Sequence, residues 1–114
     1  MLQIHHVVIQ DILVLKPSGR IDANTAQTFE EETLRHINAS FNRIIIDFSL
    51  LDYLSSAGLR ALLIVARNVK NEGGDAIMCS LPENINNVIK ISGFDTILGV
   101  YSNVEDAVSY YKNQ

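Results

Sequence analysis

The sequence has little of what marks secreted or membrane proteins. Its one cysteine, Cys79, cannot form a disulfide within the chain, and its apolar neighbours favour a small core residue over a nucleophile. No stretch approaches the roughly 18 consecutive apolar residues of a membrane span, and no basic segment precedes an apolar one at the start. We therefore expect a cytoplasmic protein without membrane insertion. The glycosylation pattern Asn38-Ala39-Ser40 carries little weight in such a chain.

The chain also contains few positively charged residues. Nine Lys and Arg residues stand against 13 Asp and Glu residues, which gives a net charge of -4 and argues against nucleic acid as a partner. Two prolines, six scattered glycines and the absence of low-complexity tracts indicate neither a linker nor a repeat. We predict that residues 1–114 form a single domain.

The common catalytic signatures are missing. A G-x-S-x-G motif around Ser56 would need glycine where Leu54 stands, and there is neither a P-loop nor a G-x-G-x-x-G motif. His5 and His6 are adjacent in an expected strand, so their side chains point to opposite faces, and no further ligand follows at metal-binding spacing. We predict that the chain is not an enzyme and holds no metal or cofactor.

What the sequence does contain is an alternation of strand and helix patterns. Two β-rich runs, 4–9 and 12–15, flank Gln10 and Asp11 at hairpin spacing. Asn24, followed three residues later by Gln27, resembles a capping box before a helix that extends to Ile37. The later elements are expected as a central strand at 44–48, a helix from Ser56 to before Gly73, a strand at 76–79, a helix from Pro82 to Gly93, a strand around 98–100 and a helix capped by Asn103.

This order predicts an α/β fold. Strands that alternate with helices need crossover connections, which give a largely parallel sheet, here with an antiparallel hairpin at its start and about four helices. Ligands and partners of such sheets usually bind outside the carboxyl ends of the strands. We therefore look for function in the loop 49–55 and at the start of the helix that follows.

Two adjacent hydroxyl groups, Ser55 and Ser56, stand at that place. A serine directly before a helix caps it by accepting backbone N–H bonds, and capping is the simpler interpretation. A serine at a helix N-terminus is also suited to accept a phosphoryl group, because the helix end stabilises the anion. Both roles can coexist on different serines. We assign Ser55 as the cap and Ser56 as the exposed hydroxyl of the first turn.

Three segments together resemble a known family. They read GRID at 19–22, IIIDFS at 44–49 and YLSSAGLR at 53–60, and they resemble the STAS domain of bacterial anti-sigma factor antagonists over nearly the entire chain. The resemblance implies a STAS-like fold and a binding module controlled by phosphorylation. In that family the unphosphorylated form binds an anti-sigma factor, often a serine kinase, and thereby frees the sigma factor. The kinase phosphorylates a serine, and a serine phosphatase resets it.

Carried over by position, the resemblance makes Ser56 the phosphoacceptor. Asp22 would lie beside it and orient the hydroxyl or the metal of the incoming kinase, or it would cap the first helix. Asp47 is a second carboxylate, unless it binds backbone amides of the following loop. Gly58 would let a partner approach closely, or would allow tight packing of helix on sheet. The remaining expected neighbours and partner contacts are Ser55, Leu59 and Arg60.

The sequence departs from the usual family pattern at two positions. Ser55 stands where aspartate is common, and Ala57 stands where a second hydroxyl is common. An alternative hypothesis is therefore a STAS subunit that is never phosphorylated and that scaffolds a stressosome-like complex or a lipid-transport ATPase. In that case Leu59 and Arg60 would matter more than Ser56.

Overall fold

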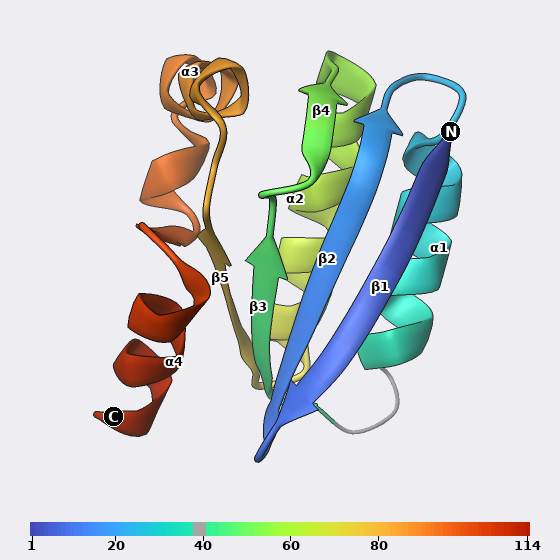
Figure 1. The fold of residues 1–114 in the computed structure, drawn as a ribbon. Coiled ribbons are helices and arrows are strands. Elements are labelled where there is room, and N and C mark those ends of the chain that lie inside the picture. The colour runs from blue at the N-terminus through green and yellow to red at the C-terminus, as the bar shows by residue number, and fades with distance from the viewer. Residues whose placement is uncertain (38–40) are drawn as a thin grey trace.

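The computed structural model describes residues 1–37 and 41–114, and the tripeptide 38–40 lies outside them. The described residues form a six-stranded mixed sheet with helices on both faces (Figure 1). In chain order the elements are β1 (Leu2–Ile9), β2 (Ile12–Ile21), α1 (Ala26–Ile37), β3 (Arg43–Asp47), β4 (Leu51–Leu54), α2 (Ser56–Asn71), β5 (Asp75–Cys79), α3 (Glu83–Ser92), η1 (Phe94–Thr96), β6 (Gly99–Tyr101) and α4 (Val104–Lys112). The predicted α/β fold with four α-helices is confirmed.

The antiparallel hairpin is confirmed, and its second strand is longer than predicted. β1 and β2 pair from Ile9↔Ile12 to Leu2↔Gly19, with Gln10 at a positive φ of 57° in the turn. On its other side β2 pairs in parallel with β3 through residues 12–15 and with β4 from Gly19 onward. Pro17 falls between these two ladders, where its missing N–H costs no hydrogen bond.

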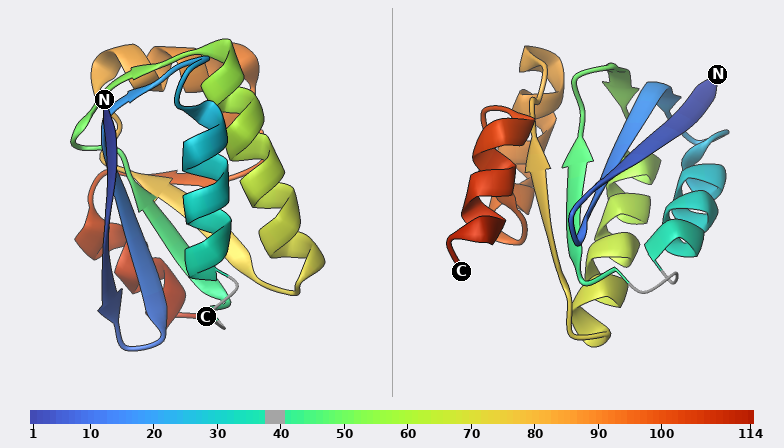
Figure 2. Two further views of the ribbon diagram at one scale, coloured as in Figure 1. Left: turned by 90° about the vertical axis from the view of Figure 1, so that its right-hand side faces the viewer. Right: turned by 60° about the horizontal axis from the view of Figure 1, so that its bottom comes forward.

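The sheet separates two apolar clusters. Its strand order is β1-β2-β3-β5-β6, with β4 beside the end of β2. The helices α1 and α2 lie side by side on one face, and α4 covers the other face (Figure 2). The buried β3 residues alternate between the clusters: Ile44 and Ile46 pack toward α1 and α2, and Ile45 packs with Tyr111 of α4. β3 is thus the central strand predicted from its run of isoleucines.

Cys79 belongs to this core, as predicted. Its side chain is buried at the end of β5. Burial raises the pKa of the thiol to about 11, so the sulfur stays protonated at neutral pH and is a poor nucleophile.

Two elements were missed by the sequence analysis. The expected loop 49–55 contains β4, and the short 3₁₀-helix η1 follows α3. In β4 only the two terminal leucines are buried, so the strand shows no alternation that a sequence pattern would reveal. Its pairing with the far end of β2 is a tertiary contact.

Candidate functional site

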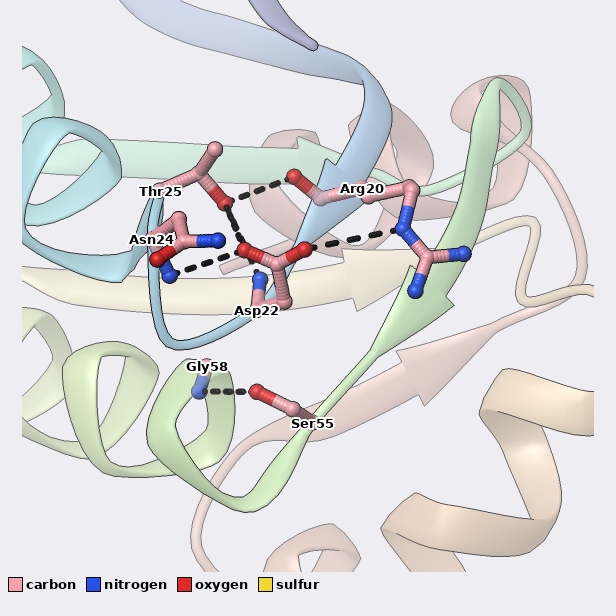
Figure 3. Close-up of polar contacts among 6 residues, drawn as sticks. All are labelled: Arg20, Asp22, Asn24, Thr25, Ser55 and Gly58. Carbon is pink, nitrogen blue, oxygen red and sulfur yellow. Dashed lines mark hydrogen bonds and ion pairs between the residues drawn. The ribbon is translucent and has the colours of Figure 1, made fainter.

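The site lies where β2 and β4 end side by side. The backbone N–H of Ser55, directly after β4, donates to the carbonyl of Ile21 at the end of β2, at 2.9 Å. This bond brings the turn that begins at Asp22 next to the start of α2 (Figure 3). Both segments leave the carboxyl edge of parallel strands, which is where the sequence predicted a site.

Ser55 caps α2, as predicted. Its backbone is extended, at φ -90° and ψ 175°, and its Oγ accepts a hydrogen bond from the N–H of Gly58 at 3.1 Å. Its carbonyl accepts the first helical bond, from Leu59, at 2.9 Å. Serine and aspartate are comparably good N-caps, so serine preserves the cap where the family commonly has aspartate.

Ser56 has a different environment from its neighbour. It is the first residue of the 16-residue helix α2 and is exposed. Within the described part of the chain its hydroxyl has no hydrogen-bond partner, whereas that of Ser55 is bound to Gly58. The N-terminus of a helix carries partial positive charge and free N–H groups, which favour an anion at this position. The predicted first-turn hydroxyl is therefore in place.

Asp22 is held in the adjacent turn by three neighbours. Its Oδ1 accepts from the N–H of Asn24 at 2.9 Å and lies 3.3 Å from the hydroxyl of Thr25, and its Oδ2 lies 3.6 Å from Nε of Arg20. The hydrogen bond from the Asn24 N–H lowers the pKa of Asp22 the most, and Thr25 and Arg20 lower it further. A partial loss of hydration acts in the opposite direction and raises it. The carboxylate is therefore ionised at neutral pH and fixed in orientation.

Arg20 and Tyr53 support Asp22 from the strands. The Arg20 guanidinium lies over the Tyr53 ring, 4.3 Å from its centroid. The hydroxyl of Thr25 donates to the Arg20 carbonyl at 2.8 Å. The sequence analysis missed these three residues, because their roles depend on contacts between β2, β4 and the turn.

The predicted capping box at Asn24 is wrong. α1 begins at Ala26, and the N–H groups of Thr25 and Ala26 bind the backbone carbonyl of Asp22 at 3.2 and 2.9 Å. The Asp22 side chain accepts from Asn24, which makes an Asx turn before the helix. The sequence spacing alone did not distinguish a cap at Asn24 from a turn organised by Asp22.

Gly58 is buried beneath the site. A Cβ at this position would lie 2.7 Å from Cδ1 of Leu54, 2.8 Å from Cγ2 of Ile21 and 2.9 Å from the Ile21 carbonyl oxygen. No side chain fits into these spaces without displacement. The structure thus gives Gly58 the packing role, since it lets α2 approach the ends of β2 and β4.

Asp47 lies at the end of β3 with its side chain 4% exposed. Its Oδ1 accepts from the N–H of Ser49 at 2.9 Å, and its Oδ2 lies 3.6 Å from Nζ of Lys16. These contacts fit the expected bond to a backbone amide of the loop. They link β3 to β2 and to the following loop. Among the described residues, Asp47 has no hydrogen bond to Asp22, Ser55 or Ser56.

A groove between α1 and α2 extends from the site. It has a volume of about 400 Å³, and Arg60 stands exposed along it, while Leu59 is half-buried against the core. The sequence analysis missed most of its lining, which comes from the turn before α1 and from the facing sides of the two helices: Ala23, Ala26, Gln27, Glu30, Ala57, Ala61 and Ile64. Ala57, where the family commonly has a second hydroxyl, belongs to this surface.

Two kinds of feature are absent from the described residues. No group of three or more His, Cys, Asp or Glu side chains is placed to hold a metal ion there. None of the described helices combines the length and the apolar character that crossing a bilayer requires.

Comparison with known proteins agrees with this fold. The family model of the STAS domain matches residues 3–107. BtrV of Bordetella bronchiseptica, named as an anti-sigma factor antagonist, is 32% identical over 91% of this chain and 90% of its own. A solved structure from Thermotoga maritima, also named as an anti-sigma factor antagonist, superimposes with a TM-score of 0.88 at 18% identity, over 94% of this chain and 92% of that one.

The fold is also that of SpoIIAA, an anti-sigma factor antagonist solved in its unphosphorylated form. The TM-score is 0.80 at 18% identity, over 100% of this chain and 98% of SpoIIAA. A phosphorylated form of SpoIIAA from Bacillus gives 0.71 at 19% identity, over 97% and 99% of the two chains. The chain therefore belongs to the STAS domain family and is related to the anti-sigma factor antagonists.

Proposed function

We propose that this chain is a cytoplasmic anti-sigma factor antagonist that is switched off by phosphorylation of Ser56. Its partner would be an anti-sigma factor with serine kinase activity, and a serine phosphatase would restore the binding form. The chain would be a substrate and a binding module, one domain over residues 1–114, and not an enzyme. The relatives named as anti-sigma factor antagonists and the existence of a phosphorylated SpoIIAA support this proposal.

The observation that carries the proposal is that the hydroxyl groups of the two serines differ in their hydrogen bonding. Ser55 is committed to the cap through its bond to Gly58, whereas Ser56 presents a hydroxyl without a partner among the described residues. In the transfer, Ser56 Oγ attacks the γ-phosphorus of ATP held by the kinase, the bond to ADP breaks, and the hydroxyl proton passes to a base. The positive end of α2 stabilises the phosphate that results.

Asp22 is proposed as the residue that orients this transfer. Its carboxylate is ionised and held by Asn24, Thr25 and Arg20. In this position it would orient the Ser56 hydroxyl or the metal ion of the incoming kinase. Asp47 and Gly58 remain predicted neighbours of the phosphorylation site. The contacts that the structure describes for them are with the loop after β3 and with the core.

The surface around Ser56 would bind the anti-sigma factor while the serine is unmodified. Arg60 and the α1–α2 groove provide one exposed cation beside small side chains, and Leu59 supports that face from below. Phosphorylation adds a charge of about -1.5 to -2, which a partner fitted to a neutral hydroxyl would repel. The switch would therefore act through local electrostatics, without refolding of the domain.

The test is binding and modification with the anti-sigma factor recovered from the native host. Ser56→Ala is expected to bind as well as wild type and to resist phosphorylation, and Ser56→Asp is expected to lose about 100-fold in affinity because it carries a charge at the interface. The matched control is Ser55→Ala, which should still be phosphorylated. Intact mass and phosphopeptide mapping assign the modified serine.

Two results would contradict the proposal. Equal affinities of Ser56→Ala and Ser56→Asp would remove the switch. A chain that stays unmodified with ATP and its kinase, and in the native host under growth and stress, would favour the STAS scaffold of a stressosome-like or lipid-transport assembly. In that case Arg60→Ala should weaken assembly more than Ser56→Ala.

A further inference from the structure

We propose that β1 pairs antiparallel with β1 of a second copy of this chain, which forms a symmetric dimer with a continuous sheet. β1 is the end strand in the order β1-β2-β3-β5-β6, and in the described part of the chain only β2 pairs with it. Figures 1 and 2 show no strand beyond it at this margin of the sheet, while α1 lies against one face of the hairpin. This inference does not depend on the proposed function.

The backbone of β1 presents alternate residues to the outside. The N–H of Gly19 in β2 donates to the carbonyl of Leu50, on the side away from β1. Its cross-strand partner Leu2 is therefore in a non-hydrogen-bonded pair, with its own N–H and C=O directed outward. By alternation the same holds for the next even-numbered residues, so that the outward set is Leu2, Ile4, His6 and Val8.

This edge lacks the features that protect edge strands from pairing. β1 is eight residues long and contains no proline, lysine, arginine, aspartate or glutamate. The opposite edge strand, β6, has three residues. Val7 and Val8 are 53% and 47% exposed, on opposite faces. A long, uncharged and partly apolar edge of this kind favours another strand over water.

Symmetry favours a second copy as the partner, and charge along the strand does not oppose it. Each chain has a net charge of -4, yet two β1 strands side by side bring no formal charges opposite one another. Two identical strands around a twofold axis also form a closed interface, which needs no other surface. A hollow beside β1 on the face that bears α4 adds the apolar side chains Val7, Val14 and Leu50, and its remaining lining is His5, His6 and Lys16.

The register follows from the outward set. All four outward residues pair only when the twofold axis passes through His5, because Leu2 then faces Val8 and Ile4 faces His6. His5 faces its own copy in a non-hydrogen-bonded pair, and Val7 faces Gln3. The antiparallel arrangement places the two Ser56 sites at opposite ends of the joined sheet, so each dimer would offer two separate binding sites.

The first test is the mass of the full chain in solution across a concentration series, by sedimentation equilibrium. We expect a reversible dimer whose dissociation constant rises about tenfold or more in Val8→Lys, which places a charge against the apolar Leu2 of the other copy. The matched control is Val100→Lys, a comparably exposed valine on β6, with circular dichroism to verify folding. A wild-type monomer up to its solubility limit, or equal effects of the two variants, would overturn the proposal.

The second test is the register itself. His5→Cys places two thiols at a pair whose Cα atoms lie about 4.5 Å apart, within disulfide range, so mild oxidation should give a covalent dimer. In Val7→Cys the two thiols are four residues out of register, roughly 14 Å apart, and should crosslink at least about tenfold more slowly. The native Cys79 is buried and common to both variants. Equal crosslinking would overturn the pairing.

Discussion

The start of α2 and the outer side of β1 differ in how their polar groups are satisfied. At the start of α2, Ser55 binds Ile21, Gly58 and Leu59, and the Asp22 turn beside it is bound at both carboxylate oxygens. Along β1, the pairing with β2 uses only the inward N–H and C=O groups. Among the described residues, the first region is a hydrogen-bonded frame beside the unbonded hydroxyl of Ser56, and the second has a row of backbone groups without partners.

This difference separates two kinds of recognition. A rigid helix start fixes the position of one side chain, which suits modification and a switch based on charge. A free strand edge offers a repeated backbone pattern, which suits association with another strand. The two regions should therefore respond differently to substitution, in both stability and binding.

The largest contrast is expected within β1. Val7→Pro removes an N–H that donates to β2, and it should cost about 3 kcal/mol of unfolding free energy. Val8→Pro removes an outward N–H and leaves the ladder intact, so its cost should be much smaller. Urea unfolding of both variants measures the difference. Equal costs would show that the outward residues are not those assigned here.

Gly58 tests how tightly the helix start is packed. In Gly58→Ala the new methyl group lies within 3 Å of Ile21 and Leu54, so we expect a loss of about 2 kcal/mol despite the better helix propensity of alanine. The control is Ala57→Ser, at the half-exposed neighbour that lines the groove, which should change stability little. A stabilised Gly58→Ala variant would contradict the packing role.

The two serines should differ in stability as they do in contacts. Ser55→Ala removes the cap to Gly58 and should cost about 1 kcal/mol. Ser56→Ala removes an exposed hydroxyl without a partner among the described residues and should stay within about 0.5 kcal/mol of wild type. Thermal and urea unfolding measure both. Equal costs would mean that Ser56 also contributes to the cap.

The smallest effect is expected where α1 packs on β1. The rings of His6 and His36 lie with their centroids 4.5 Å apart and are tilted by 39°. Burial first, then His6 and Arg35, lower the pKa of His36. The His36 imidazole therefore binds a proton more tightly in the unfolded chain than in the folded one. The free energy of unfolding should fall as the pH drops below about 6.5. His36→Gln should flatten that decline in urea unfolding, and Thr28→Gln on the same helix should not. An unchanged slope in His36→Gln would contradict this assignment.

Much of the fold was predictable because it rests on local patterns. The isoleucines of β3 indicated a strand buried on both faces, and the cap at Asn103 was identified by its residue type and accepts from Asp106 at 2.8 Å. Ser55 and Ser56 were told apart by their places before and inside the helix. These features depend on residues within a few positions of one another.

Other features were not predictable in this way. The contact between the rings of His6 and His36 joins residues 30 positions apart. β4 forms because β2 extends beyond β3 and offers free backbone groups at Gly19 and Ile21. The Asx turn at Asp22 replaced the capping box because Thr25 and Arg20 also bind there.

The sequence by itself determined the order of strands and helices except β4 and η1, the hairpin and the two serines at a helix start, since hydrophobic periodicity and capping chemistry act locally. Its three motifs indicated the family by resemblance. Tertiary structure decided the rest. It placed Asp22 beside the start of α2 through the bond from Ser55 to Ile21, buried Gly58 and, among the described residues, left the outer edge of β1 without a partner strand. The physical reason is that strand pairing and close packing join distant residues, and their geometry exists only once the sheet is assembled.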